Sequence, residues 1–261
     1  MSTAAQQAAY QRWQHQVRGA LTDHQWKVAE LVPLGLGDRE IGKALYLTEN
    51  TIKSHLKNVF RQLRPFTPQE VNRVILTVVC LRAGRVGNRP HTPEWATAAT
   101  EVLTPAEQST ITMLAQRQTE EEAGEIKPQT PNLQLCDIRE KLEPFTLAAG
   151  IERLDNEGIV EMFVRAGTIQ TPAMRQRWRV AVARLVTPRE CEVLTLVTNG
   201  MTNDQIAAEL GLSMLNVKAH LTRVVARLKP YAPAAGVIRP THRTGLTTIA
   251  IRAGLHETKS G

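Results

Sequence analysis

Two stretches of this 261-residue sequence place cationic and hydrogen-bonding side chains at helical spacing, opposite a row of aliphatic residues. The first stretch presents Lys53, Ser54, Lys57, Asn58 and Arg61, and the second presents Lys218, Ala219, Thr222, Arg223 and Arg227. Lysine and arginine neutralise phosphates, and a helix can reach base edges in the major groove of DNA. These residues could therefore bind a nucleic acid, although on an isolated helix the same charges would be a solvated amphipathic face.

Catalysis and metal binding are not indicated by the sequence. His55 and His220 could form a metal pair or act as catalytic bases, but no carboxylate or cysteine stands at ligand spacing beside them. The sequence also has no recognisable pair of catalytic carboxylates, nucleophile–base set or phosphate-binding glycine loop. We therefore expect a protein that is not an enzyme and that needs no metal and no cofactor.

The cysteines and the apolar segments indicate the compartment. Cys80, Cys136 and Cys191 are odd in number and widely spaced, which argues against a disulfide framework or a zinc site. We expect them to be small buried side chains in a reducing cytoplasm. No apolar run approaches the roughly 20 residues of a membrane span, and the N-terminus has neither the basic start nor the apolar centre of a signal peptide.

Charge is distributed unevenly along the chain, whose formal net charge is +7. Residues 1–90 carry 13 Lys and Arg against 6 Asp and Glu, a net charge of +7. Residues 91–172 carry 6 against 14, a net charge of −8, and residues 173–261 carry 13 against 5, a net charge of +8. The basic outer segments favour an acidic polymer as partner, and the acidic segment between them needs a different explanation.

An internal repeat explains this alternation. A tryptophan precedes a threonine by nine residues three times, at Trp13 and Thr22, Trp95 and Thr104, and Trp178 and Thr187. Each unit closes on an apolar stretch that ends in Ala-Gly, and aliphatic residues recur with helical rather than strand-like period. We therefore predict an all-α protein of three tandem repeats of about 83 residues, at 1–90, 91–171 and 172–261.

Helix boundaries can be read within the outer repeats. In the third repeat, Thr187-Pro188-Arg189-Glu190 is a capping box that begins a helix ending at Gly200. Thr202 and Ser213 cap the next two helices, and the last of these carries the apolar stripe Val217, Leu221, Val224 and Leu228. The first repeat follows the same plan at an offset of 165, with 14 identical residues among the 45 of residues 21–65 and 186–230.

These segments resemble the LuxR/GerE-type helix-turn-helix, which also occurs in NarL-like response regulators. The resemblance is carried in the third repeat by Val186–Glu190, Gly200–Asn203, Ile206-Ala207 and Val217–His220, and in the first repeat by Leu47-Thr48 and Thr51–His55. It covers about 45 residues of each outer repeat and a fourth helix, but not the helix with the leading tryptophan. The resemblance implies sequence-specific binding of double-stranded DNA by a bacterial transcription regulator in the cytoplasm, associated with the nucleoid and not with a membrane.

The resemblance also assigns roles to residues of the third helix. Positions matching Lys53, Ser54 and Lys57 face base edges in the family, and those matching Thr51, His55 and Asn58 lie near the DNA backbone. The corresponding residues of the third repeat are Lys218, Ala219 and Thr222 for the bases, and Asn216, His220 and Arg223 for the phosphates. We expect Arg61 and Arg227 on the same faces, and free backbone amides at the Thr48 and Ser213 caps to form an anion site.

The middle repeat differs from its neighbours. It keeps the capping box at Thr104 and Glu107, and Thr119 could cap a second helix. Its third helix replaces the DNA-facing set with Asn132, Leu133, Gln134, Cys136, Asp137 and Glu140, and Pro128 and Pro131 precede it. Because acidic side chains repel phosphate, this degenerate repeat is either a spacer, a module that binds RNA polymerase or another regulator, or a simple connection.

The fourth helices leave two arrangements open. They are unusually apolar, and in the family this helix mediates dimerisation, so two repeats of one chain could pair through it. A core role inside each repeat is equally compatible with the sequence. The alternative function is that of a protein-interaction factor, whose helix-turn-helix repeats bind RNA polymerase, a sigma factor or another regulator.

Overall fold

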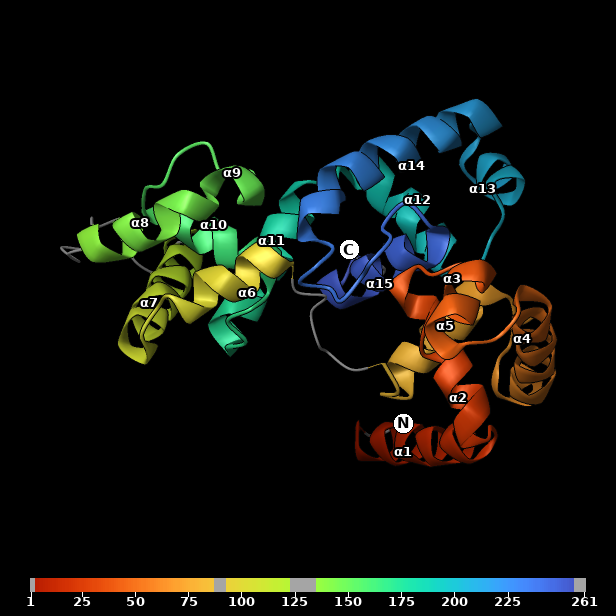
Figure 1. The fold of residues 1–261 in the computed structure, drawn as a ribbon. Coiled ribbons are helices and arrows are strands. Elements are labelled where there is room, and N and C mark those ends of the chain that lie inside the picture. The colour runs from red at the N-terminus through yellow and green to blue at the C-terminus, as the bar shows by residue number, and fades with distance from the viewer. Residues whose placement is uncertain (1–2, 87–92, 123–134, 256–261) are drawn as a thin grey trace. The chain divides into compact units, whose positions relative to one another are not determined.

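The computed structural model describes residues 3–86, 93–122 and 135–255. Every regular element in these ranges is helical, with fifteen α-helices and four short 3-10 helices (Figure 1). The all-α fold class expected from the sequence is therefore confirmed. None of the described helices is both long and apolar enough to span a membrane.

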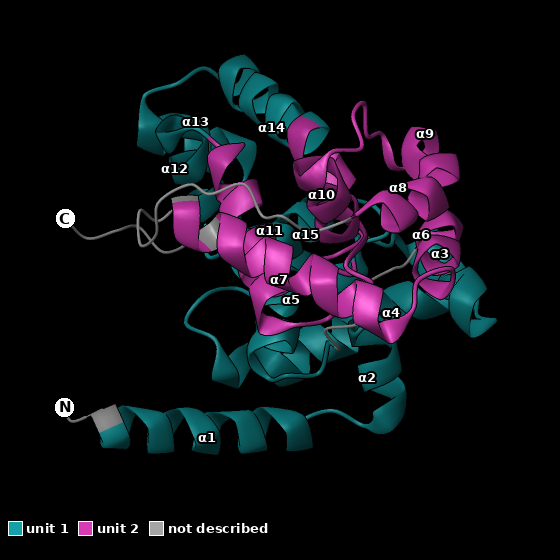
Figure 2. Ribbon diagram, turned by 90° about the vertical axis from the view of Figure 1, so that its left-hand side faces the viewer, with its two compact units in different colours: residues 1–88, 187–226, 237–261 teal, residues 89–186, 227–236 magenta. Residues whose placement is uncertain are grey.

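The chain divides into two compact units, which Figure 2 shows in different colours. Unit 1 comprises residues 1–88, 187–226 and 237–261, and unit 2 comprises residues 89–186 and 227–236. These units differ from the three ranges expected from the sequence repeats. The reason is tertiary packing: α15 (Arg243–Ala253) packs on α5 (Arg73–Arg82), and α11 (Pro172–Arg184) packs on α7 (Pro105–Glu122).

The first head of unit 1 consists of residues 22–63. Its elements are α2 (Asp23–Ala29), the 3-10 helix η1 (Val32–Leu34), α3 (Asp38–Leu45) and α4 (Glu49–Leu63). Thr22 and Thr48 cap α2 and α4, as the sequence predicts, and Gly35 ends η1 with a φ of 83°. A positive φ of this size suits glycine because it has no Cβ. The first head is flanked by α1 (Thr3–Gly19), η2 (Arg64–Phe66) and α5.

The second head consists of residues 187–228. Its elements are α12 (Pro188–Thr198), α13 (Asn203–Leu210) and α14 (Met214–Leu228). Capping boxes at Thr187 and Thr202 begin the first two helices, and Gly211 ends α13 in the left-handed conformation. These boundaries also agree with the sequence prediction. Local capping chemistry therefore marks where the helices of the second head begin and end.

Each head has an apolar core that seats its third helix. In the first head, Ile52, Leu56, Val59 and Leu63 of α4 are buried against Trp26, Val28 and Ile41. In the second head, Val217 of α14 joins Val193, Val197, Ile206 and Ala207. Burial of one stripe leaves the opposite face of each third helix toward solvent, because helical residues three and four apart share a face.

Unit 2 combines two long helices, α7 and α11, with several short ones. Its elements are α6 (Glu94–Glu101), α7, α8 (Cys136–Leu142), η3 (Glu143–Phe145), α9 (Thr146–Ala149), α10 (Asn156–Ala166), α11 and η4 (Lys229–Tyr231). The expected second helix capped by Thr119 does not begin there, because α7 continues without a break to Glu122. Residues 128 and 131–134 of the expected turn and third helix lie outside the described residues. The described third helix, α8, has seven residues against fifteen in α4 and α14.

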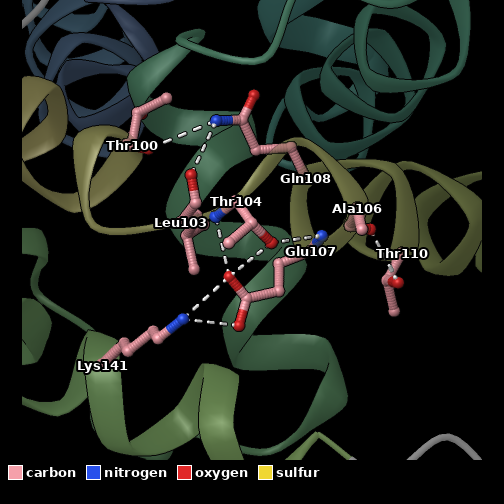
Figure 3. Close-up of polar contacts among 8 residues, drawn as sticks. All are labelled: Thr100, Leu103, Thr104, Ala106, Glu107, Gln108, Thr110 and Lys141. Carbon is pink, nitrogen blue, oxygen red and sulfur yellow. Dashed lines mark hydrogen bonds and ion pairs between the residues drawn. The ribbon is translucent and has the colours of Figure 1, made fainter.

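The capping box of α7 is tied to α8 by an ion pair (Figure 3). The Thr104 amide donates to Glu107 Oε2 at 2.7 Å, and Lys141 Nζ donates to the two oxygens of the same carboxylate at 2.8 and 3.0 Å. The hydrogen bond from Lys141 is the largest cause that lowers the pKa of Glu107, to about 2. The acidic unit thus uses a carboxylate of the capping box to hold its short third helix.

The cysteines only partly match expectation. Cys80 is buried in the core of unit 1, and burial raises the pKa of its thiol. Cys191 is half-buried, but Cys136 is exposed at the start of α8. The expectation that all three are buried is therefore wrong for Cys136, because the buried residues of α8 are Ile138 and Leu142, on the other side of the helix.

Candidate nucleic-acid interface

The exposed face of α4 carries most of the residues predicted to meet DNA. Lys53, Ser54, Lys57, Asn58 and Arg61 are exposed, and so is the capping residue Thr48. Thr51 and His55 are half-buried at the edges of this face. The buried stripe of α4 and the two supporting helices α2 and α3 therefore bring the predicted set of the first head together on one solvent-facing surface.

Two of these side chains are held by neighbours on the same helix. Lys53 Nζ lies 2.6 Å from Glu49 Oε1, and both side chains are about half exposed, at 56% and 48%. The hydrogen bond between them raises the pKa of Lys53 and lowers the pKa of Glu49. Arg61 donates to Asn58 Oδ1 at 3.1 Å. Lys53 must therefore leave a carboxylate partner, or share it, before it can contact a base.

His55 contacts a second histidine on the neighbouring helix. The rings of His55 and His24, from α4 and α2, have centroids 4.9 Å apart and are tilted by 57°. Among the described residues, no group of three or more His, Cys, Asp or Glu is placed to hold a metal ion. His24 was not among the residues singled out in the sequence, because the pairing depends on how α2 packs against α4.

The exposed face of α14 carries the predicted set of the second head. Ser213, Asn216, Lys218, Thr222 and Arg223 are exposed, whereas Ala219, His220 and Arg227 are half-buried. The Thr222 hydroxyl donates to the carbonyl of Lys218 at 2.9 Å, which fixes the side chain against its own helix. The set is again on one face, with three long cationic side chains as on α4, but one of them, Arg227, is half-buried.

Arg223 connects the face of α14 to α12. One guanidinium nitrogen lies 3.0 Å from His220 Nδ1, and another lies 3.9 Å from Glu190 Oε1. Glu190 is the buried carboxylate of the α12 capping box, so it is already bonded to Thr187. The side chain predicted to lie near phosphate is thus positioned by two partners, both of which belong to the second head.

The expected anion sites at the helix caps require a correction. The Thr51 amide donates to the Thr48 hydroxyl at 3.1 Å, and the Asn216 amide donates to the Ser213 hydroxyl at 3.1 Å. These two amides are therefore occupied rather than free, because a capping side chain satisfies the group that an anion would otherwise use. In α4 the carboxylate of Glu49 also stands in the first turn, where it would repel phosphate.

Several exposed residues around the third helices were missed by the sequence reasoning. Tyr46, in the turn before α4, is 97% exposed and has a positive φ of 56°. Met214 and Leu215, in the first turn of α14, are 44% and 74% exposed. For Tyr46 the sequence does contain a signal. The offset of 165 aligns it with Gly211, so a tyrosine stands at a turn position where the other repeat has a glycine.

The helix before each third helix also differs between the heads. Arg39 and Lys43 of α3 are exposed, and the equivalent residues of α13 are the exposed Asp204 and Ala208. These equivalent residues can be identified from the sequence, because they are 165 residues apart, as are equivalent residues of the third helices. The first head therefore presents cations on two adjacent helices and the second head on one.

An arginine at the start of each fourth helix fixes the turn in the same way. Arg73 of α5 bonds to Asp38 and to the carbonyl of Leu36. Arg243 of α15 bonds to Asn203 at 2.7 Å and to the carbonyl of Met201. Asp38 and Asn203 are equivalent residues at the offset of 165. The equivalent contacts in both heads indicate that each fourth helix orients its own helix-turn-helix.

The two fourth helices pack on each other within unit 1. Buried residues of α5 are Val74, Ile75, Leu76, Thr77, Val79 and Cys80, and α15 has seven consecutive buried residues, 244–250. A helix that is buried on all sides lies in a core rather than on a surface. Of the two arrangements left open by the sequence, unit 1 therefore contains the pairing of one outer repeat with the other.

The contacts around this pair are reciprocal. Asn72, the capping residue of α5, donates to the carbonyl of Gly200 at the end of α12, at 3.2 Å. In the other direction, Thr248 of α15 donates to the carbonyl of Pro33 at 2.6 Å, and the Arg239 amide donates to the carbonyl of Leu34 at 3.2 Å. Each fourth helix, or the segment just before it, thus reaches the opposite head after its first α-helix, at η1 in one head and at the end of α12 in the other, as in a two-fold interface.

Two heads, each with a capped third helix seated on two supporting helices, define a protein with a pair of helix-turn-helix modules. The family model described as "Bacterial regulatory proteins, luxR family" matches residues 19–69 and 184–230, which are these two heads. Helix-turn-helix domains of this family are typically regulatory and DNA-binding, and they are not enzymes. A search of curated proteins and a search of solved structures found no match.

Proposed function

We propose that this protein is a sequence-specific regulator of transcription that reads double-stranded DNA with α4 and α14. The observation that carries the proposal is that both segments matched by the luxR family model end in a third helix with one buried stripe and an exposed face of cations, amides and hydroxyls. In this function Lys53, Ser54 and Lys57 contact bases in one half of the site, and Lys218, Ala219 and Thr222 contact bases in the other.

The remaining predicted residues hold the helices on the DNA backbone. Phosphate contacts supply affinity and orientation but little sequence information. We assign this role to the residues at the edges of the two faces: Thr48, Thr51, His55, Asn58, Arg61, Ser213, Asn216, His220, Arg223 and Arg227. A regulator of this kind acts on the bacterial nucleoid in the cytoplasm.

We further propose that residues 91–171 are a degenerate third repeat that does not bind DNA. Three features support a common plan: a leading helix with a tryptophan, a capping box, and a proline-containing 3-10 helix after the third helix, at η2, η3 and η4. The leading tryptophans of the outer repeats make equivalent hydrogen bonds. Trp13 donates to the carbonyl of Phe66, and Trp178 donates to the carbonyl of Tyr231, each at the end of the 3-10 helix of its own repeat. The short α8 lacks a cationic face comparable with those of α4 and α14.

Salt dependence tests this function directly. A duplex selected from a random library is titrated with the protein between 50 and 200 mM salt, and neutralisation of about six to ten phosphates predicts an affinity loss of about 10³–10⁵-fold. Binding that is insensitive to salt, or no selection of any duplex, would instead support a protein-interaction factor.

Substitutions then assign the reading helices. Lys53→Ala and Lys218→Ala should each weaken specific binding by about 1–3 kcal/mol. The matched control is Arg12→Ala, which removes one positive charge from an exposed residue of α1 and should change affinity little. Cys136→Ser on α8 should also leave affinity unchanged, and a loss there equal to that of Lys53→Ala would contradict the role assigned to the middle repeat. A substitution at Asn132 should likewise leave the affinity for the duplex unchanged.

A further inference from the structure

We infer that a single chain binds one asymmetric DNA site, in which α4 contacts a guanine-containing half-site and α14 contacts a thymine-containing half-site at a fixed distance. This inference rests on the proposed function, because it specifies the DNA that the two heads would recognise. It goes beyond DNA binding in stating the number of chains, the symmetry of the site and the base type in each half.

One chain already contains a paired set of heads. The fourth helices α5 and α15 are packed together in unit 1, and Thr248, Asn72 and Arg239 bond to the backbone of the opposite head. Arg239 also forms an ion pair with Glu40 of α3, at 2.6 Å. These contacts are all within the same compact unit, so no second copy of the chain is needed to bring two reading helices together.

This pairing fixes the relation between the heads. The helices α4 and α14 lie on the outside of unit 1, and α5 and α15 lie between them (Figure 1). Because α15 is buried on all sides, rotation of one head relative to the other would expose an apolar helix to water. Two rigidly paired heads require half-sites at one distance and on one face of the duplex.

The two reading faces are chemically unlike. The face of α4 has two exposed lysines one helical turn apart, Lys53 and Lys57, with Ser54 beside them. The equivalent positions of α14 are Lys218, Thr222 and Ala219, and Met214 and Leu215 add exposed apolar surface in the first turn. The Thr222 hydroxyl is bonded to its own helix, which leaves its methyl group as the outward contact surface.

Base chemistry then separates the half-sites. Lysine donates to the O6 and N7 acceptors of guanine, whereas alanine and the threonine methyl group make apolar contact with the methyl group of thymine. Because Lys218 keeps one lysine on α14, the difference lies at the other two positions. Lys57 of α4 favours a second guanine, whereas Ala219 and Thr222 of α14 favour thymine. Two heads with different preferences on one rigid unit bind a site that is not a palindrome.

The number of chains and the spacing are tested first, with the duplex selected from a random library. We expect one chain per duplex by mass measurement, and footprints in which Lys53→Ala loses protection over one half-site and Lys218→Ala over the other. Inserting five base pairs turns one half-site by about half a turn, and inserting ten moves it by about 34 Å on the same face. Both insertions should weaken binding by about 10²-fold or more, because a paired contact loses its avidity.

Base analogues test the assignment of each half. Replacing guanine by 7-deazaguanine removes the N7 acceptor, and replacing thymine by deoxyuridine removes the methyl group. We expect about a tenfold loss from 7-deazaguanine at the guanine that Lys57 contacts in the half protected by α4, and this loss should be absent in Lys57→Ala. Deoxyuridine should weaken binding only in the half protected by α14, and Thr222→Ser, which keeps the hydroxyl but lacks the methyl, should remove that effect.

The outcomes distinguish this inference from the proposed function. A palindromic site occupied by two chains, each through one head, would overturn the inference while DNA binding stands. Tolerance of the ten-base-pair insertion, which flexible tethering of the heads would allow, would also overturn it. Equal sensitivity of both half-sites to both analogues would overturn the base assignment, and failure to select any duplex would overturn the proposed function itself.

Discussion

The two heads of unit 1 share a backbone plan and differ in charge. The first head exposes Arg39 and Lys43 on α3 next to the lysines of α4, whereas the second head exposes Asp204 and Ala208 on α13. Their buried stripes and helix caps are nevertheless equivalent at an offset of 165 residues. Because the core determines the helix positions and the exposed face determines the electrostatics, one plan can carry two different binding surfaces.

The contacts that join the heads also differ between the first head and the second. At Gly35 of the first head the neighbour is backbone, the carbonyl of Arg239, whereas at Gly200 of the second head it is the side chain of Ile75. Both glycines have a positive φ, of 83° and 81°; Gly35 follows η1 in the first head and Gly200 follows α12 in the second. Gly35 and Gly200 therefore need the same left-handed backbone conformation but have different neighbours.

The largest expected effect comes from a series of alanine substitutions at left-handed glycines. Gly211→Ala has nothing within 4 Å of the new Cβ and should cost about 1–2 kcal/mol through φ alone. Gly200→Ala adds a contact of 3.0 Å with the movable side chain of Ile75, so it should cost somewhat more. Gly35→Ala meets rigid backbone and should cost about 3 kcal/mol or more in the free energy of unfolding, measured by urea denaturation.

Gly211→Ala is the control for this series because it shares the backbone strain but makes no contact between the heads. If Gly35→Ala were no more destabilising than Gly211→Ala, the contact of Arg239 with the first head would not contribute to stability, and the pairing of the heads would be loose.

The second prediction makes one head electrostatically like the other. The double variant Asp204→Arg and Ala208→Lys places on α13 the two cations that α3 carries. The opposite double variant, Arg39→Ala and Lys43→Ala, removes these cations from α3. Each added or lost phosphate contact should change the slope of log K against log salt by about 1, so each double variant should shift it by about 2, in opposite directions. The measurement is a salt titration of binding to nonspecific duplex, with Arg12→Ala as the charge control. An unchanged slope in both variants would show that α3 and α13 do not approach the phosphates.

The third prediction concerns the carboxylate beside Lys53. Glu49→Gln removes the ion-pair partner of Lys53 and a negative charge from the first turn of α4. Because Lys53 no longer has to leave a carboxylate to reach a base, affinity for the selected duplex should rise a few-fold, as expected for one exposed charge pair. The control is Met214→Gln, at the equivalent position of α14, which removes no charge and should change affinity much less. Weaker binding by Glu49→Gln would mean that Glu49 orients Lys53 for the bases.

Much of each head can be predicted from the sequence because its determinants are local. The threonine and serine caps, the glycines that end helices and the apolar stripes act over a few residues, so Thr48, Gly200 and the stripe of α14 specify their elements directly. The faces of α4 and α14 follow from the same periodicity. For this reason, the predicted site residues lie together on each helix in the structure.

The pairings between distant segments could not be predicted in the same way. The contact of Thr248 with Pro33 joins residues 215 positions apart, and nothing in their types distinguishes it from packing inside one repeat. The apolar fourth helices fit both arrangements equally, because burial of a helix does not depend on which neighbour covers it. The division into compact units depends on this choice, and so it differs from the ranges of the repeats.

The smallest expected effect separates the capping boxes of the first head and of unit 2. Both boxes satisfy the amide of a threonine, but the first head uses the neutral Gln25, at 2.9 Å from Thr22 N, whereas unit 2 uses Glu107 paired with Lys141. Glu107→Gln therefore gives unit 2 the uncharged box and removes only the ion pair, so the melting temperature at pH 7 should fall by a few degrees at most. The pKa of Glu107 is lowered in the folded protein to about 2 from 4.5, so its contribution is fully present above pH 4.5 and is lost as the pH falls toward 2. Thermal melts of the two proteins should accordingly converge between pH 4.5 and 2, with Lys141→Met as the variant that breaks the same pair from the other side. A difference in melting temperature that stays constant over this range would show that Glu107 acts through the shape of the cap and not through its charge.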